Sequence, residues 1–396
     1  MKIVHTSDWH LGRRLDGESL SQPHEKFLGW LTEELLPEEK PDLLVVAGDI
    51  YDRAIPPTDA VELFEDTLAK ISSLGIKVLI TSGNHDSRVR LGANTRFLDG
   101  FGMHYRTKLN QVDRPVEIEL DDFTLLAYGI PYLEPDVDSG SQAHQWEVEA
   151  SQTAVLEEAM RRVQSDIETR RKLSGKPIRT LIASHAFVQG ASSSESERNT
   201  KVGGLGQADA AVFKDIDYVA MGHLHGQQNI AGPSSTIVRY SGSPIPFSFS
   251  ERNHAKQVFI VNFDATGIAG EVVGAEVPQV RKMIQIEDSL AQIQSNKYQP
   301  SDDWVKVVLI DKDIPINVVD TLKRKYPHLL ELDIRRQVEG SSSPRSAGSP
   351  LHKLTPPEVT KRFVERVTDQ ELTQDIVAAI DLCCEEVSKE SIQVNR

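Results

Sequence analysis

Cysteine is nearly absent from this sequence: its 396 residues include only Cys383 and Cys384, which are adjacent. A disulfide between neighbouring residues is strained, so the pair does not fit the disulfide framework of a small secreted domain. We expect both to be small apolar residues of a helix, in a protein from a reducing compartment.

Long hydrophobic runs are also missing, and none approaches the roughly 18 residues that a membrane-spanning helix needs. The first residues, MKIVHTSDWHLG, contain no apolar segment of the kind found in secretory signals. Hydrophobic residues make up 39% of the chain and charged residues 26%, which is typical of globular proteins. We therefore expect a cytoplasmic chain that is too long for one ordinary domain.

Positive charge is in short supply, since 44 Lys and Arg face 59 Asp and Glu and the net charge is −15. An acidic surface repels nucleic acids, whose phosphates are normally contacted by Lys and Arg. Composition alone therefore argues against a DNA-binding protein. Bound cations, a local basic strip or a partner must offset the charge if the chain binds DNA.

Residues 1–277 alternate short β-branched runs with helical stretches, whose apolar spacing is shown by Val61, Phe64 and Leu68. This alternation predicts an α/β domain with strands buried between helices. The predicted strands are Lys2–Thr6, Leu43–Ala47, Val78–Thr81, Thr124–Tyr128, Arg179–Ala183, Tyr218–Met221, Ile237–Tyr240, Val258–Phe263 and Gly270–Val273.

Two stretches of this domain stand apart in composition. Residues 134–177 are polar, and within them Trp146–Leu173 is expected to form a long crossover helix. Residues 190–206, GASSSESERNTKVGGLG, are rich in Ser and Gly and indicate a mobile surface loop.

The rest of the chain divides into three parts. Residues 278–338 predict a small α+β capping unit, 339–355 a flexible linker that includes EGSSSPRSAGSP, and 356–396 a pair of helices. The predicted elements of the capping unit are the strands Lys282–Ile286 and Trp304–Ile310, a helix Asn317–Lys325 and a strand Leu329–Arg335.

Five polar motifs each follow an apolar strand directly: SDWH, GDIYDR, SGNHD, SHA and GHLH. Loops at the carboxyl ends of strands in an α/β sheet converge on one crevice, so these polar side chains are expected to meet. Carboxylate oxygens and neutral imidazole nitrogens suit Mn, Fe or Zn. The candidate metal ligands are Asp8, His10, Asp49, Asn84, His185, His223 and His225.

These ligands divide into two sets. A single DxH triplet is weak evidence for a metal site. Five motifs in this order, each after a separate strand, indicate that their side chains form one functional site. Asp49 is expected to bridge two ions about 3.5–4 Å apart, because a carboxylate has two oxygens. We expect one ion to take Asp8, His10 and His225, and the other to take Asn84, His185 and His223.

The five motifs resemble the signature of the calcineurin-like metallophosphoesterases. SDWHLGRRL, GDIYDR, GNHDS, SESER followed by VGG, DYVAMGHLH and YSGSPIPFSFSE are similar to the SbcD family in particular. The resemblance covers residues 1 to about 275 strongly and the tail mainly in layout. It implies a metallophosphoesterase β-sandwich flanked by helices, followed by the capping unit and the C-terminal helical pair.

The resemblance also implies an activity and partners. It implies a manganese-dependent DNA nuclease that works with the ATPase SbcC, as a 3′–5′ exonuclease on double strands and an endonuclease on single strands and hairpins. A homodimer within a heterotetramer, acting in DNA repair, recombination and replication, is expected by the same analogy.

Two further residues are candidates for catalysis. The resemblance makes His85 a non-ligand that protonates the leaving oxygen or stabilises transition-state charge. Asp52 either accepts a proton from His85 and orients its ring, or pairs with Arg53 or caps a helix.

Other polar residues are weaker candidates. His5 lies inside a predicted strand and is expected to pack in the core, whereas Ser241 and Ser243 are expected in a tight turn beside the site. Positions predicted either to contact DNA or to be solvated are His24, His104, His254, Arg13, Arg14, Arg88 and Arg90.

Residues 356–396 are expected to dock SbcC. Two short helices behind a linker bury too little surface alone, and a partner helix laid in their groove completes the core. The alternative is that they fold back onto the capping unit. The apolar positions are Val359, Phe363, Val367, Leu372, Ile376, Ile380, Cys383 and Val387.

Two other functions compete with a nuclease. A phosphatase acting on a small molecule or a phosphoprotein uses the same metals, but it needs neither the capping unit nor the helical tail. A scaffold that keeps only the fold is expected to lack some of the ligands, and none is missing.

Overall fold

The computed structural model describes residues 1–142, 145–197, 207–335, 357, 360–361 and 376–380. The chain separates into two compact units, Met1–Arg336 and Gln337–Arg396. The predicted linker and most of the predicted helical pair, Cys383 and Cys384 included, lie outside the described residues, although Ile376–Ile380 is helical. None of the described helices has the length and apolar composition needed to cross a membrane.

A mixed sheet, sheet 1, forms one layer of the first unit. In this sheet β1, β4, β5 and β6 are parallel to one another, whereas β13 pairs antiparallel with β1. Its order is β14 (Gly267–Ile268), β13 (Gln257–Asp264), β1 (Lys2–Thr6), β4 (Leu43–Ala47), β5 (Lys77–Thr81) and β6 (Met103–Arg106), with β15 (Val273–Glu276) also on β13.

A second mixed sheet, sheet 2, packs against the first. Its central strands are parallel, and its two edge strands are antiparallel to their neighbours. Its order is β11 (Gln228–Ala231), β12 (Ile237–Tyr240), β10 (Tyr218–Gly222), β9 (Ile178–His185), β8 (Thr124–Ile130) and β7 (Val116–Glu119).

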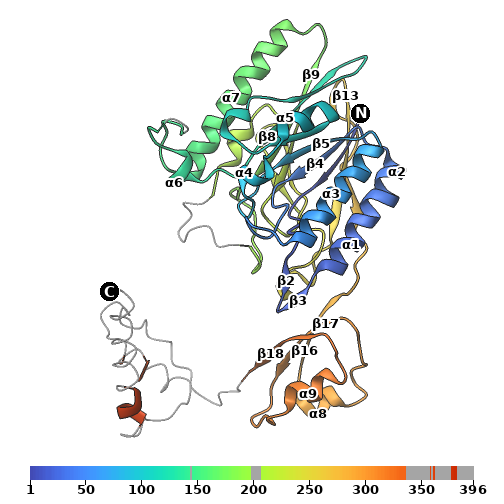
Figure 1. The fold of residues 1–396 in the computed structure, drawn as a ribbon, viewed down its shortest axis with the longest axis vertical. Coiled ribbons are helices and arrows are strands. Elements are labelled where there is room, and N and C mark those ends of the chain that lie inside the picture. Colours follow the sequence, from blue (N-terminus) through green and yellow to red (C-terminus); the bar gives the residue numbers. More distant parts are fainter. Residues whose placement is uncertain (143–144, 198–206, 336–356, 358–359, 362–375, 381–396) are drawn as a thin grey trace. The chain divides into compact units, whose positions relative to one another are not determined.

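Helices cover the outer face of each sheet (Figure 1). Apolar side chains from both inner faces, such as Leu79 and Leu181, fill the space between the sheets. The outer face of sheet 1 is covered by α1 (Ser21–Trp30), η1 (Leu31–Leu35), α2 (Leu36–Glu39) and α3 (Thr58–Ser73), and that of sheet 2 by α7 (Gln152–Leu173). The predicted α/β sandwich flanked by helices is confirmed.

Short elements complete the domain. They are β2 (Arg14–Leu15), β3 (Glu18–Ser19), α4 (Arg88–Leu91), α5 (Thr95–Leu98), η2 (Asp99–Phe101), η3 (Leu109–Gln111), α6 (Pro135–Asp138), η4 (Ala210–Phe213) and η5 (Phe249–Glu251).

Two predicted elements need correction. A strand over Gly270–Val273 is wrong, because Gly270 has a φ of 78° and the strand β15 begins only at Val273. The crossover helix begins at Gln152 and not at Trp146. Ser151 caps it, since its hydroxyl accepts the backbone N–H of Ala154 at 3.2 Å.

The capping unit is a three-stranded parallel sheet with two helices. It packs on the two-sheet domain through Met283 and Trp304, which join Leu15 and Phe247 in one apolar cluster. The indole N–H of Trp304 also donates to Glu18 Oε1 at 3.2 Å. Its elements are β16 (Met283–Asp288), α8 (Leu290–Gln294), β17 (Trp304–Leu309), α9 (Val318–Lys323) and β18 (Leu329–Ile334).

Candidate metal centre

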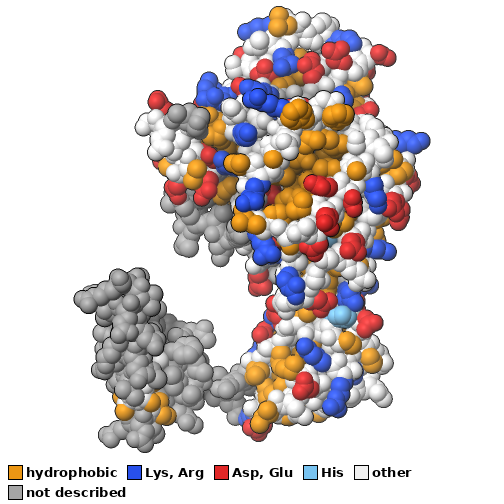
Figure 2. All heavy atoms as spheres, in the orientation of Figure 1, with side chains coloured by type: hydrophobic (Ala, Val, Ile, Leu, Met, Phe, Trp, Pro, Cys, Tyr) orange, Lys and Arg blue, Asp and Glu red, His pale blue; other side chains and the backbone are white. Residues whose placement is uncertain are grey.

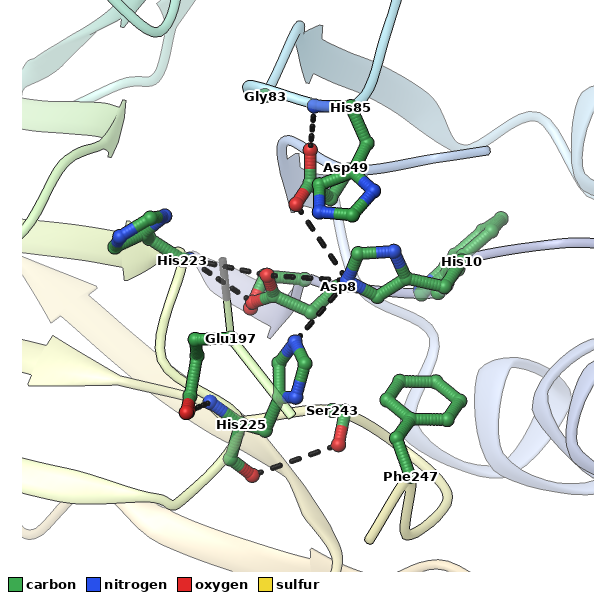
Figure 3. A network of polar contacts seen from close by, with 12 residues as sticks. Asp8, His10, Asp49, Gly83, His85, Glu197, His223, His225, Ser243 and Phe247 are labelled. Carbon is green, nitrogen blue, oxygen red and sulfur yellow. Dashed lines mark hydrogen bonds and ion pairs between the residues drawn. The ribbon is translucent and has the colours of Figure 1, made fainter. Parts of the chain in front are cut away.

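The seven candidate ligands meet where strands of both sheets end (Figure 3 shows five of them). Asn84 is half-buried, and the others are buried. Sheet 1 supplies Asp8 and His10 after β1, Asp49 after β4 and Asn84 after β5, whereas sheet 2 supplies His185 at the end of β9 and His223 and His225 after β10.

Several of these ligands have a backbone conformation that non-glycine residues rarely adopt. The φ angles of Asp8, His10, Asp49 and His223 are 54°, 46°, 51° and 104°. Hydrogen bonds between the first two loops hold this conformation, with Asp8 N–H donating to Gly48 O and His10 N–H to Asp49 O, each at 3.0 Å. Strain held in place by the surrounding structure is a common feature of functional sites.

Glycines in the motifs let the loops approach one another. A Cβ on Gly48, whose φ is +85°, would lie 2.3 Å from His185 Nδ1. A Cβ on Gly83 would lie 2.1 Å from Asp49 Oδ1. The glycines of GD and GNH are therefore needed because any side chain there would displace a ligand.

The first predicted ligand set is Asp8, His10 and His225. One atom from each lies within 4.8 Å of the others. His10 Nε2 is 3.1 Å from His225 Nε2 and 4.0 Å from Asp8 Oδ1. Burial holds the pKa of His10 well below its ordinary value, so the ring is neutral and presents a lone pair. Facing acceptor atoms of this kind fit a cation between them.

The second predicted set is Asn84, His185 and His223. Asn84 Oδ1 lies 3.1 Å from His185 Nε2 and 3.0 Å from His223 Nδ1. His185 Nδ1–H donates to Ala47 O at 2.8 Å, which leaves Nε2 as the ligand atom. Burial lowers the pKa of His223 to about 3, so this ring is also neutral.

Asp49 stands between the two sets. Its Oδ2 is 3.5 Å from His10 Nε2 and 3.4 Å from His185 Nε2, while Oδ1 accepts the backbone N–H of His85 at 2.9 Å. Burial opposes ionisation of Asp49, but the positive charge of His185 beside it outweighs burial and holds the pKa of the carboxyl well below its usual range. An ionised carboxylate shared by two ligand sets fits two divalent cations.

The predicted catalytic pair differs from expectation in one contact. His85 Nδ1–H donates to the backbone carbonyl of Asp52 at 2.7 Å, and not to its carboxylate. That carboxylate lies 3.4 Å from Arg13 Nη1 and 3.7 Å from His10 Nδ1. The expectation that the Asp52 side chain orients His85 is therefore wrong, because the loop after β4 turns the carbonyl toward the ring.

The weaker candidates separate clearly. His5 is buried with Nδ1 3.0 Å from Tyr218 Oη, as predicted for a core residue. His24 is buried too, with Nε2 2.8 Å from Trp9 O, so neither solvent nor DNA contact fits it. Arg88 is paired with Asp138 through both of its terminal nitrogens. Positions that are exposed are His254, Arg14 and Arg90, and those that are half-buried are Arg13 and His104.

Sequence reasoning missed the residues that support the ligands. The carboxylate of Asp86 accepts the backbone N–H groups of Gly83, Ile50 and Tyr51, which ties the second and third motif loops together. The Ser7 hydroxyl donates to Asp8 Oδ2 at 2.5 Å. Asp86 carried a sequence signal, because it stands in the same motif as Asn84.

Two sequence profiles match parts of this chain. The sequence profile described as calcineurin-like phosphoesterase matches residues 1–227. This chain belongs to the calcineurin-like phosphoesterase family. It is therefore a metal-dependent phosphoesterase whose fold and ligand sets agree with that membership. A second profile, described as the type 5 capsule protein repressor C-terminal domain, matches residues 279–368.

Individual relatives extend over nearly the whole chain. Two proteins named as the SbcD component of the nuclease SbcCD, from Staphylococcus epidermidis and Staphylococcus saprophyticus, are each 28% identical over 94% of this chain and 95% of their own length. The SbcD resemblance seen in the motifs is thus confirmed. Among solved structures, a dimetal phosphatase from Danio rerio is 13% identical with a TM-score of 0.43, covering 70% of this chain and 99% of that chain.

Proposed function

We propose that this chain is a DNA nuclease that hydrolyses phosphodiester bonds with two divalent cations, manganese foremost. The observation that carries the proposal is Asp49 Oδ2, which faces His10 Nε2 at 3.5 Å and His185 Nε2 at 3.4 Å. One carboxylate between two sets of nitrogen and oxygen donors supports a two-cation site. Mixed donors of this kind suit Mn, Fe or Zn, and the resemblance to the SbcD family favours manganese among them.

The chain's own residues supply positioning and proton transfer. When bound, the two cations polarise the phosphate and activate a water for in-line attack. His85 is proposed to serve the leaving oxygen, because its Nδ1–H is fixed on Asp52 O and a proton on Nε2 makes the ring a general acid. Asp52 is proposed to hold Arg13 beside the site, where its guanidinium meets a substrate phosphate.

DNA is the proposed substrate for two reasons. Both relatives named above are called nucleases over almost the full length of this chain. The capping unit also forms, with the catalytic domain, a hollow of about 470 Å³. Its charged lining residues are Arg252, Lys306, Arg335, Glu195 and Asp333. We propose that residues 278–338 use this junction to select DNA ends, although Lys306 and Arg335 each pair with acidic neighbours.

We propose further that the nuclease works with the ATPase SbcC in the cytoplasm, in DNA repair, recombination and replication. The support is the name of the two relatives, which gives them as one component of SbcCD. Exonuclease action on double strands with 3′–5′ polarity and endonuclease action on single strands and hairpins belong to the same proposal. Residues 356–396 remain the proposed docking module, joined by the linker 339–355.

A homodimer is proposed through an apolar surface over α3 to α5, which we call the α3–α5 patch (Figure 2). The exposed apolar residues on or next to α3, α4, α5 and η2 include Ile55, Val89, Phe97 and Phe101. Beside the patch is a hollow of about 580 Å³ whose lining includes Phe64, Leu68 and Leu98. An exposed apolar patch of this kind marks an interaction site, and a second copy offers the same surface to it.

The test of the proposed function is a cleavage assay on defined DNA ends, hairpins and single strands, with Mn²⁺ or with a chelator, with and without SbcC. A chromogenic phosphodiester and a phosphomonoester are assayed in parallel, and Glu168→Ala, a substitution at an exposed position of α7 outside the site, is the control. We expect DNA cleavage that the chelator abolishes. Hydrolysis of the monoester without cleavage of any DNA would favour the phosphatase alternative.

A further inference from the structure

His225 is held at more points than its role as one ligand requires. Its backbone N–H donates to Glu197 Oε1 at 2.7 Å, and its backbone carbonyl accepts Lys256 Nζ at 3.0 Å and the Ser243 N–H at 3.2 Å. Its ring Nδ1 lies 2.5 Å from the Ser196 hydroxyl. Figure 3 shows Glu197 and Ser243 around His225, whose ring also faces His10.

The direction of the hydrogen bonds through Ser196 follows from its partners. Glu251 Oε1 accepts from the Ser196 hydroxyl, since a carboxylate has no proton to give. The Ser196 oxygen therefore accepts from His225 Nδ1–H. This chain of hydrogen bonds places the proton on Nδ1 and leaves Nε2, 3.1 Å from His10 Nε2, as the atom that binds a cation.

Glu251 and Lys256 form a buried ion pair behind this relay. Their side chains are 0% and 3% exposed, and Lys256 Nζ donates to Glu251 Oε2 at 2.5 Å. Taking two charges out of water is costly, so a pair at such a position is poorly explained by stability alone. Lys256 also donates to Ser243 Oγ at 2.9 Å, which ties the segment before β13 to the turn beside the ligands.

His10, the other histidine of the first set, lacks a comparable hydrogen bond at Nδ1 in the part of the chain that the structure describes. Its Nδ1 is buried without a hydrogen-bond partner among the described residues, and the nearest carboxylate oxygen, on Asp52, is 3.7 Å away. In the second set, His185 Nδ1 is held by the backbone carbonyl of Ala47, which no side-chain substitution removes. Of these three rings, His225 is the one whose Nδ1 is hydrogen-bonded to a side chain.

We propose that Ser196, Glu197, Glu251 and Lys256 form a positioning device for His225 that sets the affinity of the first cation position. The proposal rests on the two-cation function proposed above and deepens it. Ser196 and Glu197 lie in the Ser-rich stretch after β9, so this segment reaches from sheet 2 to the ligand set of the first ion. Ser196 O also accepts Arg13 Nη2 at 3.0 Å, which joins the proposed phosphate contact to the same device.

The experiment compares Ser196→Ala, Ser196→Thr and Ser193→Ala with the unaltered chain. Ser193 is the matched control, because it is an exposed serine of the same segment. Metal-free protein is titrated with Mn²⁺, and the stoichiometry and both affinities are measured by calorimetry and by the electron spin resonance of coupled manganese. Circular dichroism checks the fold of each variant.

We expect Ser196→Ala to lower the affinity for one of the two ions by about 10–100-fold. At sub-saturating Mn²⁺ the spin coupling between the two ions should then be lost. Ser196→Thr, which keeps a hydroxyl, is expected to restore the ion, and Ser193→Ala to change nothing. Glu251→Gln changes the acceptor of the Ser196 hydroxyl, so it should weaken the binding of the same ion. Two ions bound by Ser196→Ala with unchanged affinities would overturn the positioning role alone. An unaltered chain that binds fewer than two ions would overturn the two-cation function as well.

Discussion

The imidazole Nδ1 of His85 lies 2.7 Å from the backbone carbonyl oxygen of Asp52. A backbone carbonyl persists whatever side chain stands at position 52, so the ring keeps this partner when the carboxylate is removed. The carboxylate has another neighbour, Arg13 Nη1 at 3.4 Å. The two residues that sequence reasoning joined as one catalytic unit are therefore separable by mutation.

His85→Ala is expected to lower kcat on DNA by about 10²–10⁴-fold, because it removes the proton donor for the leaving oxygen. Asp52→Asn is expected to cost less than about tenfold in kcat, since His85 keeps its orientation. Steady-state kinetics and metal analysis of both variants check this, with both ions retained in each. An equal loss of kcat in the two variants would show that the carboxylate acts on the chemistry itself.

Metal binding is expected to strengthen as the pH rises. Burial disfavours a charged His185 ring, but Asp49 and Asp8 outweigh it and raise the pKa of the metal-free ring to about 9. Below that pH a proton occupies His185 and must leave before the ring binds a cation. The apparent affinity of one ion should therefore fall about tenfold per pH unit below pH 9. Manganese titrations over a pH series that ends at this pKa measure the slope, and a flat profile for both ions contradicts it.

The α3–α5 patch is expected to hold two copies of the chain together. Phe97 and Phe101 are each 76% exposed, so Phe97→Glu with Phe101→Glu puts charge in the interface without disturbing the core. Leu173→Glu is the matched control, because Leu173 is 82% exposed at the end of α7. Light scattering should give a dimer for the control and a monomer for the double variant. A dimer in both variants places the interface elsewhere.

Removal of residues 351–396 is expected to abolish co-purification with SbcC. The reason lies in the sequence, where a linker isolates two amphipathic segments that need a partner to bury their apolar faces. Metal-dependent cleavage by the truncated chain on its own should persist, because all seven candidate ligands precede residue 226. Full-strength binding of SbcC by the truncated chain would show that the contact lies in another part.

The convergence of the seven candidate ligands was predictable because each follows an apolar strand, and the carboxyl ends of parallel strands meet wherever such a sheet forms. The sandwich was predictable for the same reason, from buried runs such as Leu43–Ala47. The start of α7 was not, since Trp146 is buried and apolar like a helix residue while Ser151 alone sets the cap.

The residues that hydrogen-bond to the candidate ligands could not be predicted from the sequence. Ser196 and Glu251 are 55 residues apart, and only the folded structure brings them to His225. The stretch around Ser196 has the composition of a mobile loop, yet its residues Ser194–Glu197 form specific bonds. Composition reports how freely a segment bends, and it carries no information on the buried partners that the segment meets.

Metal content per chain, measured on Asp49→Ala beside His85→Ala and the unaltered protein, tests the central claim most directly. The unaltered chain and His85→Ala should each bind two manganese ions. Asp49→Ala should lose occupancy of both positions and all nuclease activity, because one carboxylate faces both ligand sets. Two ions retained in Asp49→Ala, or metal-free His85→Ala, would contradict the account.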